Sequence, residues 1–305
     1  MRTFLTGGTG FVGGYLHAHL ESSGDSVAVL DDRLDLGDPA AVEPLDKALA
    51  ASAPDVVYHL AALTHVGRSW EDPTATMRVN VLGTLAVLEA ARRLRTRPKV
   101  MLISSAEVYG VGEGLPISEE RALAPVTPYA ASKVAAEYLG LQAFLGRGLH
   151  VVRARPFNHV GPGQGDAFVV PALARRIVDA ERAGDSSIPV GNLAASRDFT
   201  DVRDVVRAYR LLAVLGVAGE AYNVCSGSAR TIQELFDILI SHAARPIVTR
   251  TDADLFRPVD VPVLVGDATK LHSLTGWKPE IPIDSTLAAV LDDWRKREAA
   301  SGLRP

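Results

Sequence analysis

Tyr129 and Lys133 are the residues whose types and spacing point most directly to chemistry. Side chains four positions apart share one face of a helix. A protonated lysine beside a tyrosine favours the phenolate, and so it lowers the pKa of the phenol from its usual value of about 10. The pair therefore predicts redox or proton chemistry at an alcohol or a carbonyl group. Because this spacing also occurs by chance on exposed helices, the surrounding sequence has to supply the context.

Two further polar residues precede this pair. Ser105 follows an apolar run, residues 99–104, that predicts a strand, and Glu107 is two positions further on. The Ser105 hydroxyl could hold a carbonyl or sugar oxygen beside Tyr129. Glu107 is either a second acid/base group or a solvated loop carboxylate.

A glycine-rich turn near the N-terminus predicts a nucleotide site. Gly7, Gly10 and Gly13 form G-x-x-G-x-x-G, and Phe11 and Val12 lie between the last two. Glycine permits a positive φ and lets backbone N–H groups approach a pyrophosphate. Since the turn joins a predicted strand to a predicted helix, its context is the one that dinucleotide binding requires.

The next strand leads into Asp31, Asp32 and Arg33, which bear on the choice of cofactor. A carboxylate at Asp31 can accept hydrogen bonds from the adenine-side ribose, which favours NAD. Arg33 could instead pair with a 2′-phosphate, which favours NADP. The expected cofactor is therefore NADP or NAD.

The third predicted strand ends in small or apolar residues that would let its backbone lie close to the cofactor. These are Leu60, Ala61 and Ala62. His59, just before them, is interpreted as a packed core histidine. Asn80, in the long helix that follows, can be explained as a surface polar residue.

Short apolar runs alternate with amphipathic stretches through the first half of the chain. The expected strands cover residues 2–6, 26–30, 56–60, 99–104 and 150–154, and the expected helices cover residues 11–22, 39–51, 74–94 and 128–144. Such alternation predicts an α/β fold with a doubly wound parallel (Rossmann) sheet. Sheets of this kind bind ligands at the carboxyl ends of their strands.

The second half is less regular and predicts a smaller C-terminal α/β lobe for the substrate. Helices are expected at residues 168–182, 199–215 and 232–242, a strand at 221–225, and an exposed extended segment at 257–265, where two prolines stand. The dinucleotide-binding domain is expected to comprise residues 1–160, completed by about 194–228. The sugar-nucleotide lobe would then comprise about 161–193 and 229–305.

Composition excludes several classes of protein. The 305 residues are 47% hydrophobic and 22% charged with a net charge of −4, which is an ordinary globular profile and gives no support for nucleic-acid binding. Cys225 is the one cysteine, so neither an intramolecular disulfide nor a cysteine-rich metal site is expected. No apolar run is long enough for a membrane span, and structure is predicted from the first residues on, so the expected location is cytoplasmic.

These features together resemble the extended branch of the short-chain dehydrogenase/reductase superfamily, over nearly the whole chain. That family carries the glycine motif, a Ser or Thr four residues before a Tyr-Gly pair, and Tyr-x-x-x-Lys. Here Ser105 precedes Tyr109-Gly110, and Tyr129 and Lys133 complete the pattern. The resemblance implies that Ser105, Tyr129 and Lys133 are catalytic.

Extended members mostly act on nucleotide sugars, and the resemblance implies where such a substrate binds. Pro156 and Asn158 stand where the family places cofactor and substrate contacts, and Val170 is expected at the substrate. Arg197 and Arg257 match two family positions for arginines that bind the diphosphate. A planar guanidinium suits a diphosphate because it donates two parallel hydrogen bonds.

The segment Arg-Pro-Phe-Asn-His-Val-Gly-Pro-Gly-Gln at residues 155–164 gives a narrower resemblance, supported by residues 168–171, 190–193, 197–205 and 223–227. It is similar to GDP-6-deoxy-4-keto-D-mannose reductases. This implies NAD(P)H-dependent reduction of GDP-4-keto-6-deoxy-D-mannose to GDP-D-rhamnose. Tyr129 would protonate the developing alkoxide, Lys133 would hold the nicotinamide ribose, and Ser105 would bind the C4 oxygen.

Other functions stay open at this point. Glu107 aligns with the glutamate of related 4,6-dehydratases, so a dehydratase or a sugar-nucleotide 4-epimerase is an alternative. A non-catalytic dinucleotide-binding sensor is an alternative of another class, although such proteins commonly lose the tyrosine or the lysine. The family also implies a homodimer formed through the helices at 74–94 and 128–144.

Overall fold

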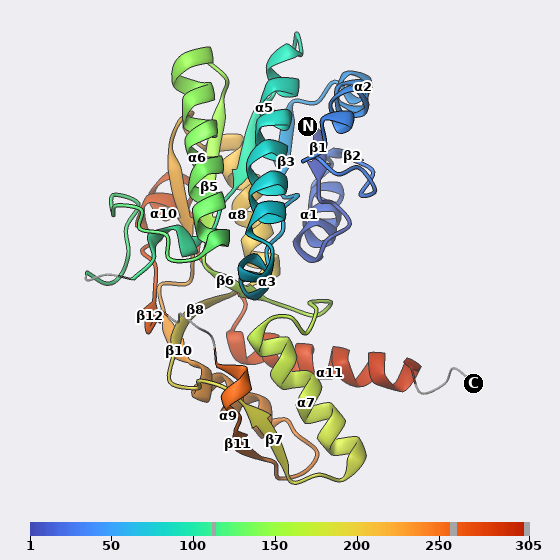
Figure 1. Ribbon diagram of the computed structural model, residues 1–305, viewed down its shortest axis with the longest axis vertical. Coiled ribbons are helices and arrows are strands. Elements are labelled where there is room, and N and C mark those ends of the chain that lie inside the picture. The colour runs from blue at the N-terminus through green and yellow to red at the C-terminus, as the bar shows by residue number, and fades with distance from the viewer. Residues whose placement is uncertain (112–113, 257–260, 302–305) are drawn as a thin grey trace.

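A six-stranded parallel sheet forms the larger part of the molecule (Figure 1). The structure, a computed structural model, describes residues 1–111, 114–256 and 261–301. Across the sheet the strands run β2 (Ser26–Val29), β1 (Arg2–Thr6), β3 (Val56–His59), β4 (Lys99–Ile103), β5 (Val151–Pro156) and β9 (Ala221–Val224). The order reverses beside β1, which is typical of a doubly wound sheet. The predicted α/β fold with a Rossmann sheet is confirmed.

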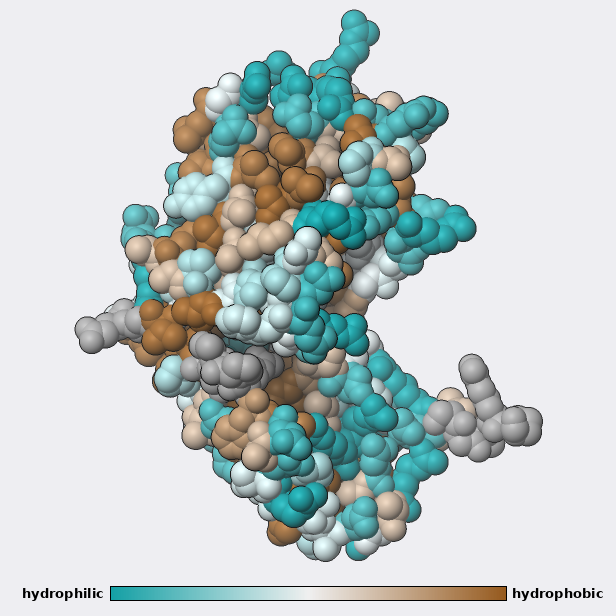
Figure 2. All heavy atoms as spheres, in the orientation of Figure 1, coloured by the Kyte–Doolittle hydropathy of each residue, from teal (hydrophilic) through white to brown (hydrophobic). Residues whose placement is uncertain are grey.

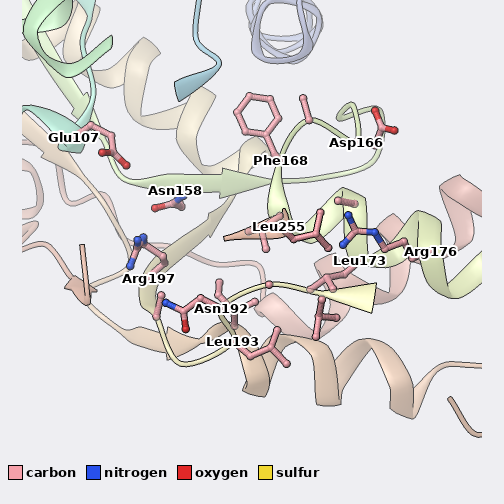
Figure 3. A pocket seen from close by; sticks show the side chains of 17 residues that line it. Glu107, Asn158, Asp166, Phe168, Leu173, Arg176, Asn192, Leu193, Arg197 and Leu255 are labelled. Atoms are coloured by element: carbon pink, nitrogen blue, oxygen red, sulfur yellow. The ribbon is translucent and has the colours of Figure 1, made fainter. Parts of the chain in front are cut away.

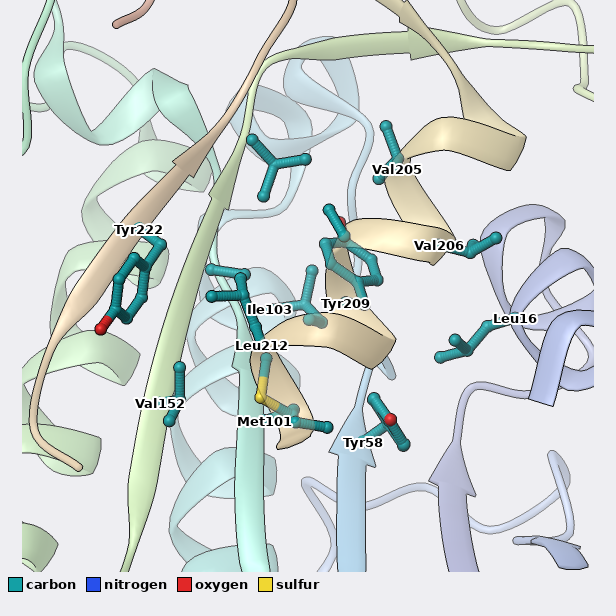
Figure 4. Close-up of a cluster of buried hydrophobic side chains, with 14 of the residues drawn as sticks. Leu16, Tyr58, Met101, Ile103, Val152, Val205, Val206, Tyr209, Leu212 and Tyr222 are labelled. Carbon is teal, nitrogen blue, oxygen red and sulfur yellow. The ribbon is translucent and has the colours of Figure 1, made fainter. Parts of the chain in front are cut away.

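Helices cover both faces of this sheet because its strands are apolar on both sides. One face carries α2 (Val42–Ser52), α5 (Gly83–Arg93) and α6 (Pro128–Arg147), and the other carries α1 (Phe11–Ser22), α8 (Val202–Leu215) and α10 (Thr269–Thr275). Along β4, Val100 and Leu102 pack toward the first set, whereas Met101 and Ile103 pack toward the second. Figure 4 shows the core on the side of α8, to which Tyr58 of β3 and Tyr209 of α8 both contribute. Two buried faces explain why these strands are continuously hydrophobic in the sequence.

A second hydrophobic core lies in the lower part of the molecule (Figure 1). Its helices are α7 (Val169–Ala183), α9 (Ile232–Ser241) and α11 (Ile283–Ser301). Its strands are β7 (Ser187–Val190), which pairs with β11 (Val248–Thr251), and β8 (Ser196–Asp201), which pairs with β6 (Asn158–Val160), β10 (Ala229–Thr231) and β12 (Val263–Leu264). This core lies where the smaller lobe is expected. The limits of the two domains stay a prediction.

The predicted helix at 199–215 is wrong at its start. Phe199 and Thr200 belong to β8, and the helix begins only at Val202, where Asp201 caps it by accepting a hydrogen bond from the Arg203 N–H at 2.8 Å. At these two residues β8 pairs with β6, and this pairing buries both side chains, so tertiary packing outweighs the local helical pattern.

The long helix predicted at 74–94 is divided into α4 (Pro73–Met77), a π-helical turn at Arg78–Leu82 and α5. Asn80 lies in this turn and is buried, so its interpretation as a surface residue is wrong. Its amide donates hydrogen bonds to the Leu63 carbonyl and to the Ser132 hydroxyl, and its carbonyl accepts one from the Leu63 N–H at 2.7 Å. Asn80 thus ties the loop after β3 to α6.

Part of the exposed segment predicted at 257–265 lies outside the described residues, namely 257–260. In the part that is described, Val261 and Leu264 are buried, because β12 packs beside β8. The expected exposure is therefore wrong at Val261, Leu264 and Val265, and it is confirmed at Pro262 and Val263.

Candidate active site

The turn between β1 and α1 leaves room for a pyrophosphate only because it lacks side chains. Gly7 has a φ of +70°, and a Cβ there would lie 2.7 Å from the Ala61 nitrogen. A Cβ on Gly13 would lie 2.1 Å from the Gly7 carbonyl oxygen. Gly10 precedes α1 and caps it without any side-chain hydrogen bond, so the first N–H groups of the helix can bind an anion. The turn thus fits a dinucleotide cofactor, with Phe11 and Val12 opening the helix.

Asp31 and Arg33 form an exposed ion pair just after β2. The guanidinium donates to both carboxylate oxygens, with Nη2 2.6 Å from Oδ2 and Nε 3.0 Å from Oδ1. Hydrogen bonding to Arg33 lowers the pKa of the Asp31 carboxyl to about 2. The pair brings a carboxylate suited to ribose hydroxyls and a guanidinium suited to a 2′-phosphate to one place, and Asp32 is exposed beside them.

The end of β3 lies against the glycine turn. Ala61 donates its N–H to the Thr6 hydroxyl, and Leu60, Ala61 and Ala62 are half-buried. His59 is buried between the hydroxyls of Thr6, at 2.8 Å, and Thr84, at 3.0 Å. Burial lowers the pKa of its imidazole to about 3, so the ring is neutral. The interpretation of His59 as a packed core histidine is confirmed.

Tyr129 and Lys133 lie on the buried face of α6, each 6% exposed. Burial raises the pKa of the Tyr129 phenol, and hydrogen bonding with Ser105 opposes this only in part. Burial also lowers the pKa of the Lys133 ammonium, to about 8. Its Nζ donates to the Ile103 carbonyl at 2.9 Å and lies 6.0 Å from the centre of the Tyr129 ring.

The expectation that Lys133 lowers the pKa of Tyr129 is therefore wrong for this state of the molecule. The cost of placing a phenolate in a buried site exceeds the attraction of an ammonium that is bound elsewhere. Tyr129 is a neutral phenol, and a neutral phenol can donate a proton.

A cavity of about 250 Å³ lies against the second core (Figure 3). Glu107 lines it, whereas Tyr129, Lys133 and Ser105 do not. Glu107, Asn158 and Arg197 project into one end, from the short helix Ala106–Tyr109 and from β6 and β8. Arg197 is 8% exposed and donates through Nη1 to the Ser196 carbonyl. The other end is lined by Phe168, Leu173, Arg176, Asn192, Leu193 and Leu255. Arginine and amide donors set among apolar side chains suit a phosphorylated ligand with a flat, partly apolar group.

Three predicted residues need separate comment. Val170 does not line the cavity: its side chain is 1% exposed and packs in the second core, whereas the neighbouring Val169 reaches the cavity wall. Pro156 ends β5 at the carboxyl edge of the sheet. Arg257 lies outside the described residues.

Sequence reasoning missed other residues of the cavity. Arg176 and Asn192 line it, but neither belongs to a recognisable chemical pattern. Arg176 lies on an amphipathic helix, where arginine is ordinary, and Asn192 lies in the Val-Gly-Asn-Leu segment, which had been linked to the family without a role. Only their positions in space reveal them.

Two absences in the described part of the chain bear on other functions. No group of three or more His, Cys, Asp or Glu side chains in that part of the chain could hold a metal ion. No helix among the same residues is long and apolar enough to cross a membrane.

Comparison with known proteins agrees with this geometry. Residues 33–290 match the family described as GDP-mannose 4,6 dehydratase. The chain is 42% identical to a GDP-6-deoxy-D-mannose reductase of Pseudomonas aeruginosa over 97% of its own length and 98% of the relative's. It also matches a solved structure of RMD from Pseudomonas aeruginosa complexed with NADPH, at a TM-score of 0.89 and 40% identity, covering 97% of this chain and 100% of the other. A complex of Thermus thermophilus UDP-glucose 4-epimerase with NAD matches at a TM-score of 0.85 and 30% identity. The match covers 97% of this chain and 99% of the epimerase chain.

Proposed function

Because the chain belongs to the GDP-mannose 4,6-dehydratase family of extended short-chain dehydrogenases/reductases, which are NAD(P)-dependent enzymes, we propose that it reduces GDP-4-keto-6-deoxy-D-mannose to GDP-D-rhamnose. The observation that carries the direction of the reaction is the 42% identity, over 97% of the chain, to a GDP-6-deoxy-D-mannose reductase, and a protonated Tyr129 agrees with it. Reduction of a ketone needs a proton donor, whereas oxidation of an alcohol needs a base. The 42% identity to a GDP-6-deoxy-D-mannose reductase supports the choice of substrate.

Each residue of the site has one task in this proposal. When bound, the reduced nicotinamide supplies the hydride for C4 of the sugar. Tyr129 gives its phenolic proton to the C4 oxygen, and the Ser105 hydroxyl donates a hydrogen bond to the same oxygen as charge develops there. Lys133 binds the nicotinamide ribose. Asn158 and Arg197, which line the cavity, bind the diphosphate. The family resemblance adds Arg257, which lies outside the described residues.

A specific observation also favours a 4,6-dehydratase as a second candidate. Glu107 lines the cavity, and its charge acts on Tyr129. A carboxylate at that place could remove a proton from the sugar carbon next to C4, which elimination of water requires. A dehydratase, like an epimerase, oxidises C4 first and recycles its bound cofactor.

A product assay separates these functions. With GDP-4-keto-6-deoxymannose and NADPH, we expect one NADPH oxidised for each sugar reduced, because the proposed reaction consumes hydride. Loss of absorbance at 340 nm measures the cofactor, and chromatography with NMR measures the sugar; parallel runs with NADH give the cofactor preference. Turnover of GDP-mannose without net NADPH oxidation would contradict the reductase and support the dehydratase, and Glu107→Gln should then abolish the activity. If neither sugar is converted, the result would support the non-catalytic sensor instead.

We also propose a homodimer formed through α5 and α6. Hydrophobic side chains gather over these two helices (Figure 2). Leu85 on α5 is 40% exposed, and on α6 Tyr138 is 57% and Leu145 is 72% exposed. Exposed apolar groups on adjacent helices are typical of a surface that another chain covers. The proposed place of action is the cytoplasm.

The oligomeric state tests this interface. We expect a mass of twice 32.4 kDa by light scattering, and we expect Leu85→Glu to weaken the dimer at least 100-fold because it buries a carboxylate without a partner. Val217, 52% exposed and outside both helices, provides the control: Val217→Glu should stay dimeric. A monomeric wild type at micromolar concentration would disprove the interface.

A further inference from the structure

A third charged residue continues the buried face that carries Tyr129 and Lys133. Glu137 is one helical turn beyond Lys133 and is 0% exposed, the most buried of the three side chains. Positions 129, 133 and 137 therefore form a row along one side of α6. A fully buried carboxylate is rare unless something pairs with it, so its partners show what it does.

Three consecutive residues contact this row: Ile103, which ends β4, and the two serines that follow it. The Ile103 carbonyl accepts a hydrogen bond from Lys133 Nζ at 2.9 Å. The Ser104 hydroxyl donates to Glu137 Oε1 at 2.5 Å, and the Ser105 hydroxyl interacts with the Tyr129 phenol. The end of β4 thus fixes each member of the row by a separate contact. A shift of α6 along its axis would break all three contacts together.

Arg155, on β5, holds the other side of the Glu137 carboxylate. Its Nη2 lies 2.7 Å from Oε2, and its Nε lies 3.0 Å from Oε1. Arg155 also donates through Nη1 to the Tyr109 hydroxyl at 2.9 Å, and that hydroxyl donates to Asn223 Oδ1 at 2.7 Å. A bidentate pair inside a connected network restrains the carboxylate strongly.

The charged and titratable groups around Lys133 come from four elements. They are His59 at the end of β3, Tyr129 and Glu137 on α6, Arg153 and Arg155 on β5, both paired with Glu137, and Glu107 in the short helix after β4, whose charge acts on Tyr129. His59 is neutral, and so is Tyr129. Among the described groups, Glu137 is the carboxylate that acts on Lys133.

We propose that Glu137, held by Ser104 and Arg155, is a positioning residue that keeps Lys133 protonated and fixed beside Tyr129. The proposal rests on the proposed function only in assigning Lys133 to the active site. Burial alone lowers the pKa of Lys133, and the charge of Glu137 raises it, which leaves a value of about 8. Without that charge the ammonium would lose its proton nearer to neutral pH.

The titration of Lys133 tests this directly, in the absence of substrate and cofactor. The protein is labelled with ¹³C-lysine, the Cε signals are followed from pH 6 to pH 11 by NMR, and Lys133→Met identifies the signal. We expect Glu137→Gln to lower the pKa of Lys133 by about one unit or more, because an adjacent opposite charge is worth about one to three units. The double variant Glu137→Gln/Arg155→Gln should lower it by a smaller amount, because it also removes the positive charge behind the carboxylate. In both variants Arg153, which also pairs with Glu137, keeps its hydrogen bond to the Gly219 carbonyl. If Glu137→Gln does not fold, the double variant carries the test.

Ala136→Gly is the matched control, because Ala136 is a buried neighbour on α6 that carries no charge. It should lower the melting temperature without moving the Lys133 titration. If a folded Glu137→Gln or double variant titrates Lys133 as the wild type does, the proposal is wrong. That result would not contradict the proposed reductase activity. If the product assay shows no reduction, the titration still tests the effect of Glu137 on Lys133.

The pH profile of kcat/KM gives a second readout. Because Lys133 has to be charged, the wild-type activity should fall as pH rises through about 8. In Glu137→Gln the fall in kcat/KM should occur at a lower pH, and the difference should equal the change in the pKa of Lys133 measured by NMR. A purely structural defect would instead lower kcat/KM equally at every pH.

Discussion

Replacing Tyr129 with phenylalanine is expected to lower kcat by about 1,000-fold, since a positioned proton donor contributes roughly 10²–10⁴-fold to such a reaction. The substitution removes only the hydroxyl, and the aromatic ring keeps its place on the buried face of α6. KM for the sugar nucleotide should change little, because the predicted contacts to the diphosphate lie on β6 and β8. Steady-state rates and the melting temperature, measured on the same preparation, check both expectations.

Tyr138→Phe is the control for this experiment. Tyr138 lies on the same helix but is 57% exposed, so loss of its hydroxyl should leave kcat within about twofold of the wild type. If Tyr129→Phe retained wild-type kcat with an unchanged melting temperature, Tyr129 would not be the proton donor, and a water molecule or Glu107 would have to be considered in its place.

The second large effect is expected at the glycine turn, where two adjacent glycines should behave in opposite ways. Gly13→Ala should weaken NADPH binding at least 100-fold. Its Cβ would lie 2.1 Å from the Gly7 carbonyl oxygen and 2.7 Å from the Gly8 backbone, so the turn must move away from α1. That movement displaces the N–H groups that face the pyrophosphate. Titration of NADPH fluorescence measures the dissociation constant.

Gly14→Ala, one position along the same helix, is the matched control. No atom lies within 4 Å of a Cβ at Gly14. Alanine should therefore leave NADPH affinity unchanged and stabilise α1 by about 1 kcal/mol, because glycine is a poor helix former. Equal affinity in both variants would show that close packing at Gly13 does not shape the cofactor site. A rise in melting temperature for Gly14→Ala alone would show that the helix itself is intact.

Local patterns were enough to predict the parallel sheet and its glycine turn. The first strands and helices follow from runs of apolar residues and from helical periodicity, which are properties of neighbouring residues. The start of α8 could not be predicted in the same way. Phe199 and Thr200 have a helical pattern, but β8 pairs with β6, β10 and β12, and these strands come from distant parts of the chain.

The burial and the partners of polar residues near the site could not be predicted from the sequence. Asn80 resembles a surface residue in the sequence, yet it bonds to Leu63 and Ser132 inside the molecule. No pattern in the sequence distinguishes Glu137, because glutamate is common on helices. Its meaning depends on Ser104 and Arg155, which lie 33 and 18 positions away along the chain.

The sequence by itself determined which groups the chain can use: a tyrosine and a lysine four residues apart, a serine after a strand, and glycines where a pyrophosphate needs bare backbone. Only the tertiary structure decided the protonation states of Tyr129 and Lys133. Spacing alone suggested that Lys133 would lower the pKa of Tyr129, but the fold buries both groups and binds Lys133 to Ile103, so the pKa of the phenol is raised instead. The physical reason is that a pKa depends on solvent exposure and on charges brought close in space, and strands and helices far apart in the chain supply both.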